Sequence, residues 1–182
     1  MKIAIPRERR AHETRVAASP ETVKKLCGLG CEVVVEKGAG SDAAFADDAY
    51  KQAGATIGKD AKATLAGAEV VLKVQRPIAG GADDEIALID KGAIVIAIMD
   101  PMRAGDDMAA LAKAGLTAFA MDLMPRITRA QSMDVLSSQA NLAGYKAVLD
   151  AAAEYGRAMP MMMTAAGTIA PARALVMGAG VA

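Results

Sequence analysis

Short apolar runs alternate with helix-like segments along residues 1–123, and this alternation restricts the folds open to the chain. Lys2–Ile5, Glu32–Glu36 and Ala93–Ile98 are rich in Val, Ile and Ala, and their valines and isoleucines favour strands. Ala93–Ile98 is apolar throughout, as expected of a strand buried on both faces. Because strand and helix patterns alternate along the chain, we predict an α/β fold in which a doubly wound parallel sheet forms a Rossmann-like lobe.

Turn and capping residues separate the predicted elements. Ser19 followed by Pro20 indicates a helix start, with serine as N-cap and proline at the first helical position. Further strands are expected at 69–74 and 116–120, and further helical segments at 47–54, 85–90 and 106–114.

The pattern of apolar and polar residues changes after residue 123. Residues 124–134 are polar and non-periodic, which predicts a loop, and 137–158 have a helical pattern. After a connection at 159–171, Ala174–Met177 has the pattern of a strand. We therefore predict two domains, residues 1–136 as the N-terminal lobe and 137–182 as a linking helix with the start of a second Rossmann lobe.

The composition argues against several classes of function. Acidic and basic residues balance at 21 each and aromatic residues make up 3%, which disfavours nucleic acid as a partner. No apolar run reaches the roughly 18 residues of a membrane span, and the start lacks a signal-peptide core, so we expect a cytoplasmic protein. His12 is the only histidine and Cys27 and Cys31 have no second pair, so no metal site is expected.

The end of the chain carries a glycine pattern. Gly178 and Gly180 follow the predicted strand, as in the opening of a dinucleotide-binding fingerprint. The first glycine would allow a tight turn, and the second would let the backbone approach a pyrophosphate. A helix-terminating turn or a disordered tail is the alternative for so short a pattern.

A polar loop precedes the long predicted helix. It includes Arg126, Gln131, Asp134 and Ser137, and it follows a strand, where open α/β sheets bind ligands. Arginine can donate two hydrogen bonds to a phosphate or an amide oxygen, and Asp and Ser can hold an amide. The alternative is a solvated loop in which Asp134 or Ser137 caps the helix.

Two further segments have simpler interpretations. Arg7–Arg15 could bind an anionic group beyond the first strand, but a charged loop of balanced sign is favoured. The Met159–Met163 run suits core packing better than a flexible hinge.

Several of these stretches resemble one known family. Arg126–Tyr145, Met161–Gly180, Ile3–Glu8, Arg15–Pro20 and Val71–Pro77 closely resemble the alpha subunit of proton-translocating NAD(P) transhydrogenases. The match runs from end to end, and that family shares its fold with alanine dehydrogenase.

Alanine dehydrogenases differ from this chain at one position of their amino-acid site. They handle the amino acid with a lysine near Lys73, an arginine near Arg15 and a histidine after the next strand. Residues 98–101 here, Ile-Met-Asp-Pro, contain no histidine. This departure argues against an alanine dehydrogenase.

The transhydrogenase resemblance implies roles for the polar loop. NAD(H) would bind this subunit, with Arg126 and Ser137 orienting the nicotinamide ring and its carboxamide and Asp134 as a further partner. Gln131 would reach toward the ribose and the partner's nucleotide. Arg126, Gln131 and Asp134 are thus the expected catalytic residues; the expected cofactor-binding set adds Ser137, Gly178 and Gly180.

The same resemblance implies an enzyme assembled from several subunits. Hydride would pass from NADH to NADP⁺, with NADP(H) on a separate subunit and proton translocation through a membrane subunit. The chain would be a homodimer held peripherally on the inner face of the membrane by these partners. Because it stops inside the fingerprint, we expect it to bind NAD(H) poorly and to be inactive alone. The alternatives are a non-catalytic dimerisation lobe and, less favoured, an amino-acid dehydrogenase of the alanine type.

Overall fold

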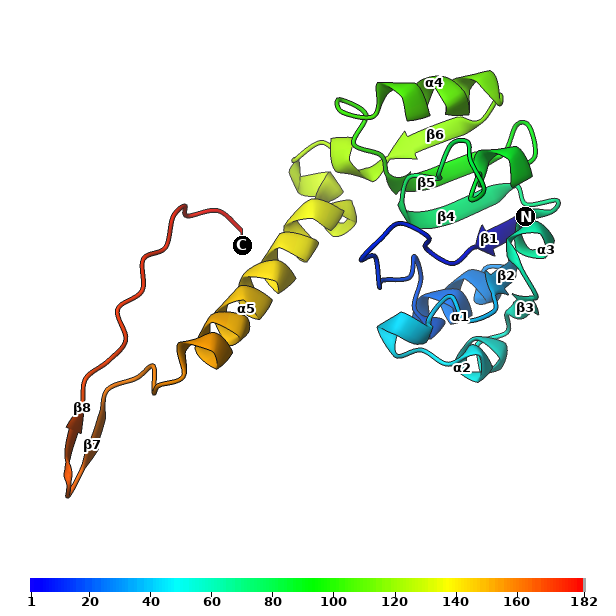
Figure 1. Cartoon of the computed structure of the whole chain (residues 1–182). Helices are drawn as coiled ribbons and strands as arrows, with labels where there is room; N and C mark the ends of the chain where they lie inside the picture. The colour runs from blue at the N-terminus through cyan, green and yellow to red at the C-terminus, as the bar shows by residue number, and fades with distance from the viewer. Residues whose placement is uncertain (182) are drawn as a thin grey trace. The chain divides into compact units, whose positions relative to one another are not determined.

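The computed structural model describes residues 1–181 and contains two compact units. The first comprises Met1–Met124 and the second begins at Pro125. Figure 1 shows both units. The domain boundary expected after residue 136 stays a prediction.

A six-stranded parallel sheet forms the centre of the first unit, in the order β3-β2-β1-β4-β5-β6. The strands are β1 (Lys2–Ile5), β2 (Glu32–Glu36), β3 (Thr56–Gly58), β4 (Val70–Gln75), β5 (Ile94–Ile98) and β6 (Thr117–Ala120). The α-helices are α1 (Pro20–Gly28), α2 (Asp47–Gln52), α3 (Ala61–Leu65) and α4 (Gly105–Lys113), and the 3₁₀ turns are η1 (Ser41–Ala43), η2 (Ile86–Leu88) and η3 (Met121–Leu123). The strand order reverses between β1 and β4, which is the Rossmann arrangement and confirms the predicted fold class.

Two apolar clusters cover the two faces of the sheet. The register pairs Ile3 with Val70 and Ala4 with Val71, and successive pairs belong to opposite clusters because side chains alternate along a strand. Leu65 of α3 and Leu111 of α4 pack in one cluster. The other cluster contains Val23 of α1 and Tyr50 of α2, and the half-buried thiols Cys27 and Cys31 pack against it.

The sheet is less completely covered over β5 than expected. Val95 and Ala97 are buried, whereas Ile94 and Ile96, on the opposite face, are only half-buried. The helices of that second face, α1 and α2, lie in the connections among β1, β2 and β3, and β5 is at the other side of the sheet. The expected strand is confirmed, but its burial on both faces is not.

Most differences from the sequence prediction involve short elements. The β3 strand and the five-residue helix α3 are absent from the prediction, because each is too short to show a periodic pattern. The helical patch expected at 85–90 is reduced to the 3₁₀ turn η2. Ser19 caps α1 as predicted, and its side chain accepts the N–H of Thr22 at 3.3 Å.

The second unit has little sheet structure. It consists of the 3₁₀ helix η4 (Thr128–Met133), the long helix α5 (Val135–Tyr155) and an antiparallel hairpin of β7 (Met162–Thr164) and β8 (Gly167–Ile169). The hairpin replaces what the sequence pattern predicts to be a simple connection. None of the α5 residues is buried in the structure, although Leu142, Tyr145 and Val148 are large and apolar.

The strand expected at Ala174–Met177 is wrong for the chain as it stands. In the part of the chain that the structure describes, these residues form no strand, and Leu175, Val176 and Met177 are 81–91% exposed. A strand needs a neighbour for its backbone hydrogen bonds, and the β7–β8 hairpin of the same unit does not include these residues. Separately, within residues 1–181 no helix combines the length and apolar character required to cross a bilayer.

Close packing at Gly40 gives a first prediction. A Cβ at Gly40 would lie 2.7 Å from the Tyr50 ring and 2.8 Å from the Phe45 carbonyl oxygen. We expect Gly40→Ala to lower the free energy of unfolding by about 1–3 kcal/mol, the usual cost of overpacking. Gly105, which has open space around it, is the control, and Gly105→Ala should be neutral or stabilising. Equal denaturant midpoints for the two variants would contradict this packing.

Candidate functional site

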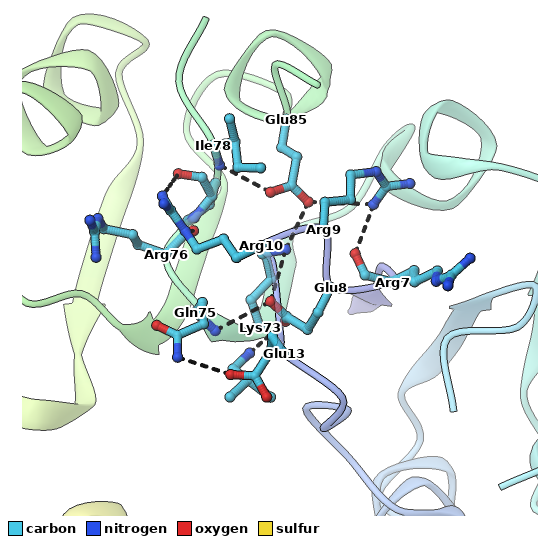
Figure 2. Close-up of polar contacts among 12 residues, drawn as sticks. Arg7, Glu8, Arg9, Arg10, Glu13, Lys73, Gln75, Arg76, Ile78 and Glu85 are labelled. Atoms are coloured by element: carbon cyan, nitrogen blue, oxygen red, sulfur yellow. Dashed lines mark hydrogen bonds and ion pairs between the residues drawn. The ribbon is translucent and has the colours of Figure 1, made fainter. Parts of the chain in front are cut away.

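A network of charged side chains fills the point of the first unit where the strand order reverses (Figure 2). In open α/β sheets this crevice, beyond the carboxyl ends of the strands, is the usual place for a ligand. Here the chain leaves β1 at Pro6 and runs as an irregular segment, residues 6–15, across the carboxyl end of β4.

Lys73 is the centre of the network. It lies on β4 with its side chain 2% exposed, and its Nζ donates to Glu85 Oε1 at 2.7 Å. A second carboxylate, that of Glu8, lies 3.4 Å from the same Nζ. A buried ammonium is costly unless it is paired, and two carboxylates, each also 2% exposed, provide the pairing.

Glu8 also completes the hydrogen bonding of β4. β1 pairs with β4 only through Ile3 and Ala4, so later N–H groups of β4 lack a partner on that strand. Glu8 accepts the N–H of Val74 at 2.7 Å and the N–H of Gln75 at 3.4 Å. The carboxylate therefore occupies the place that a ligand or another strand would take.

Two arginines attach residues 6–15 to the neighbouring strands. Arg9 donates to Glu36 at the end of β2, at 2.5 Å, and lies 3.5 Å from Glu85. Arg10 donates to the carbonyl oxygen of Arg76 at 3.1 Å and pairs with Asp107 of α4 at 3.4 Å. The segment is thus bound to β2, β4 and α4 by charged groups.

Glu13 is the most strongly hydrogen-bonded carboxylate of the segment. It accepts from Arg15 Nε and Nη2, each at 2.7 Å, and from Gln75 Nε2 at 2.9 Å. The hydrogen bonds from Arg15, assisted by Gln75, lower the pKa of Glu13 to about 2.

A polar cavity of about 490 Å³ opens beside these residues, lined in part by His12, Lys37 and Asp42. Its lining charges largely neutralise one another, as in the Arg9–Glu36 pair and the Arg7–Asp42 pair at 3.5 Å. This agrees with the interpretation of residues 7–15 as a charged segment of balanced sign.

The predicted site residues lie in the second unit, around the start of α5. Asp134 is the N-cap of α5, and its carboxylate accepts the Ser137 N–H at 3.0 Å and the Ser137 hydroxyl at 2.6 Å. The hydrogen bonds from Ser137 lower the pKa of Asp134, and the positive charge of Arg126 lowers it further. The structure thus brings Asp134 and Ser137 together, with Arg126 near enough for its charge to act on Asp134, and Asp134 also serves as the helix cap.

The other predicted site residues are more exposed. Arg126 and Gln131 are exposed, and Gln131 joins the cluster through its main chain, whose carbonyl accepts the Asp134 N–H at 3.3 Å. Gly178 and Gly180 lie in an exposed segment without regular structure, and Gly178 has φ 108°. Their role toward a pyrophosphate remains a prediction.

Sequence reasoning missed some residues that shape the carboxyl edge of the sheet. The Lys73 network was signalled by a lysine inside an otherwise largely apolar strand, Val70–Gln75. Asp122 gave no such signal, yet its carboxylate accepts the N–H groups of Met99 and Asp100 at 2.8 and 2.9 Å. These bonds hold the end of β5, where Asp100 has a positive φ of 47°.

Breaking the buried pair at Lys73 should be costly. We expect Lys73→Met to lower the free energy of unfolding by about 3–5 kcal/mol, because the buried carboxylate of Glu85 loses its cation. Lys51→Met removes an exposed pair with Asp48 and should change the free energy of unfolding far less. Urea titrations compare the variants, and equal costs would show that Lys73 does not hold the network together.

The lowered pKa of Glu13 predicts that the protein becomes less stable at acid pH. Since its folded pKa is lowered, its contribution is complete above the ordinary value of 4.5 and is lost as pH falls toward about 2. Thermal unfolding between pH 2 and 6 should therefore show a steeper acid loss in the wild type than in Glu13→Gln. Parallel curves would contradict the Arg15–Glu13 pairing.

Comparison with known proteins places the chain beside transhydrogenase subunits and alanine dehydrogenases. Residues 4–143 match the family model "Alanine dehydrogenase/PNT, N-terminal domain", and residues 147–182 match the corresponding C-terminal domain model. The chain is 60% identical to the first component of NAD(P) transhydrogenase subunit alpha from Rhodospirillum rubrum over 183 aligned residues, covering 100% of this chain and 48% of that protein. The chain thus spans about half the length of this curated relative.

Solved structures give the same grouping. The crystal structure of transhydrogenase from Sinorhizobium meliloti superposes with a TM-score of 0.88 at 57% identity, covering 94% of this chain and 50% of that chain. An L-alanine dehydrogenase superposes with a TM-score of 0.71 at 32% identity, covering 79% of this chain and 38% of that one.

Proposed function

The chain belongs to the alanine dehydrogenase/PNT family, and on this premise we propose that it forms a portion of the NAD(H)-binding alpha subunit of a proton-translocating NAD(P) transhydrogenase. The observation that carries the proposal is the cluster of Arg126, Asp134 and Ser137 at the start of α5. The greater similarity to transhydrogenases than to alanine dehydrogenases supports it.

The cluster has the donors and acceptors that a nicotinamide carboxamide requires. The exposed guanidinium of Arg126 can donate to the carboxamide oxygen. The Ser137 hydroxyl donates to Asp134, which leaves its oxygen lone pairs to accept a carboxamide N–H. Asp134 therefore orients Ser137 and, together with Arg126, fixes the face of the ring that is presented.

NAD(H) would supply the hydride, and the residues of the chain would bind and orient it. No side chain of the cluster needs to act as an acid or base, because hydride transfer moves no proton at the protein. Gln131, exposed on η4, would reach toward the ribose and the neighbouring nucleotide. Gly178 and Gly180 would let the backbone approach the pyrophosphate.

The proposed reaction requires other chains. Hydride passes from NADH to NADP⁺ held by a separate subunit, and a membrane subunit couples the transfer to proton movement. In this proposal the chain is a homodimer, peripheral on the inner, cytoplasmic face of the membrane through those partners.

An alanine dehydrogenase is the less favoured candidate. Its amino-acid site would need the Lys73 ammonium, which is buried here between Glu8 and Glu85. It would also need the histidine that follows β5 in that group. This chain has Asp100 there, and the N–H groups of Met99 and Asp100 both donate to the Asp122 carboxylate. A non-catalytic lobe is the remaining alternative, and a measurement of nucleotide binding distinguishes it from the proposed function.

The direct test of nucleotide binding is a fluorescence titration with NADH, on this chain and on one extended through a complete Rossmann lobe. We expect only the longer chain to bind tightly, and Arg126→Ala to weaken it by about 10–100-fold, the value of a hydrogen bond from a charged group. Arg129→Ala, an exposed arginine of η4, is the matched control and should bind as the wild type does. Unchanged binding in Arg126→Ala, or no binding by the longer chain, would refute the proposal.

Asp134 allows its charge to be separated from its capping role. Asn caps a helix about as well as Asp, so Asp134→Asn should keep α5 intact, whereas Asp134→Ala should destabilise the start of the helix. If Asp134 is only a cap, NADH binding follows helix stability and the asparagine variant binds normally. We expect both variants to bind more weakly in the extended chain.

A further inference from the structure

The network around Lys73 contains more buried carboxylates than cations. Among the residues that the structure describes, four carboxylates at most 8% exposed take part: Glu8, Glu13, Glu36 and Glu85. Three cations pair with them: Lys73, Arg9 and Arg15. If all seven groups were ionised, these buried pairs would carry one excess negative charge, next to Arg10 and Arg76, which share Asp107 and are more exposed than the four carboxylates. A buried charge that is not compensated is costly, and such groups generally neutralise.

Three of the four carboxylates are well compensated. Glu13 accepts several bonds from Arg15, and Glu36 accepts from Arg9 and from the Arg7 N–H at 2.8 Å. Glu85 receives Lys73 at 2.7 Å and the Ile78 N–H at 3.0 Å.

Glu8 is the least compensated carboxylate. One oxygen accepts the Val74 N–H at 2.7 Å, but the other has only long contacts, with Lys73 Nζ and the Gln75 N–H, each at 3.4 Å. The Glu8 side chain is 2% exposed, although Glu8 also lines the polar cavity described above.

We propose that this network binds one proton and that the proton resides on Glu8. The oxygen with the longer contacts holds it, while the other oxygen keeps the bond from β4. Both cations that face Glu8 interact more closely with another carboxylate. Lys73 of β4 lies closer to Glu85, and Arg15 donates its hydrogen bonds to Glu13. Burial raises the pKa of Glu8 above its ordinary value of 4.5 in spite of Lys73.

The proton makes the first unit sensitive to pH in a direction opposite to that of Glu13. A carboxyl whose folded pKa is raised stabilises the fold below its unfolded pKa and loses that contribution as pH rises through the folded pKa. In that window the unfolding equilibrium constant of the wild type should rise by up to about tenfold per pH unit through this group alone.

Two measurements on the intact chain test the proposal. In a ¹³C NMR titration of the side-chain carboxyls, Glu8 should titrate above the exposed glutamates, such as Glu32 at the start of β2. A Glu8 midpoint at or below that of Glu32 would overturn it, and this result needs no variant.

The second measurement is chemical unfolding at a series of pH values above 4.5, the ordinary pKa of a glutamate. Glu8→Gln mimics the protonated carboxyl, so it should match the wild type at the acid end and become the more stable protein as pH rises. Glu32→Gln, the matched control, should follow the wild type throughout. If the wild type and Glu8→Gln stay parallel over this range, Glu8 does not bind the proton.

Discussion

The fold of the first unit depends on which groups accept hydrogen bonds from the N–H groups at the end of β4, where β1 no longer pairs with that strand. Only two residues of β1 pair with β4. The Glu8 carboxylate accepts hydrogen bonds from the N–H groups of Val74 and Gln75, which β1 leaves unpaired. Lys73 is buried at the same point and joins Glu8 to Glu85. At the crevice where open α/β sheets usually bind ligands, paired charges of the protein hold the sheet edge together, and a polar cavity of about 490 Å³ remains among them.

The functional cluster uses a different device, a helix N-terminus. Asp134 caps α5 through Ser137, and Arg126 reinforces its negative charge. In the proposed function this small polar group orients one end of NAD(H), and the chemistry belongs to the cofactor. The two units therefore contribute differently: the first supplies a rigid, internally neutralised fold, and the second supplies the residues proposed to touch the nucleotide.

Sequence alone predicts the parallel sheet well because its longer strands carry apolar runs, such as Val33–Val35 within β2, and because Ser19 marks a helix start. It offers capping of the long helix by Asp134 or Ser137 only as the alternative to a ligand-binding loop, and it does not predict that these two residues bond to each other. It misses β3 and α3, whose few residues show no period, and it wrongly assigns a strand to Ala174–Met177, because apolar content cannot reveal whether a pairing neighbour exists. Long-range charge networks such as that of Lys73 depend on tertiary contacts that no local pattern contains.

The most direct measurement of the proposed function follows the hydride itself. The complete subunit would be mixed with an NADP(H)-binding partner subunit and given NADH deuterated at the transferred position, and the label would be located by mass spectrometry. We predict that deuterium appears in NADPH without loss to solvent, because the hydride passes directly between the two nicotinamides. Oxidation of NADH by pyruvate and ammonium, with no label in NADPH, would contradict the proposed function and identify an amino-acid dehydrogenase instead.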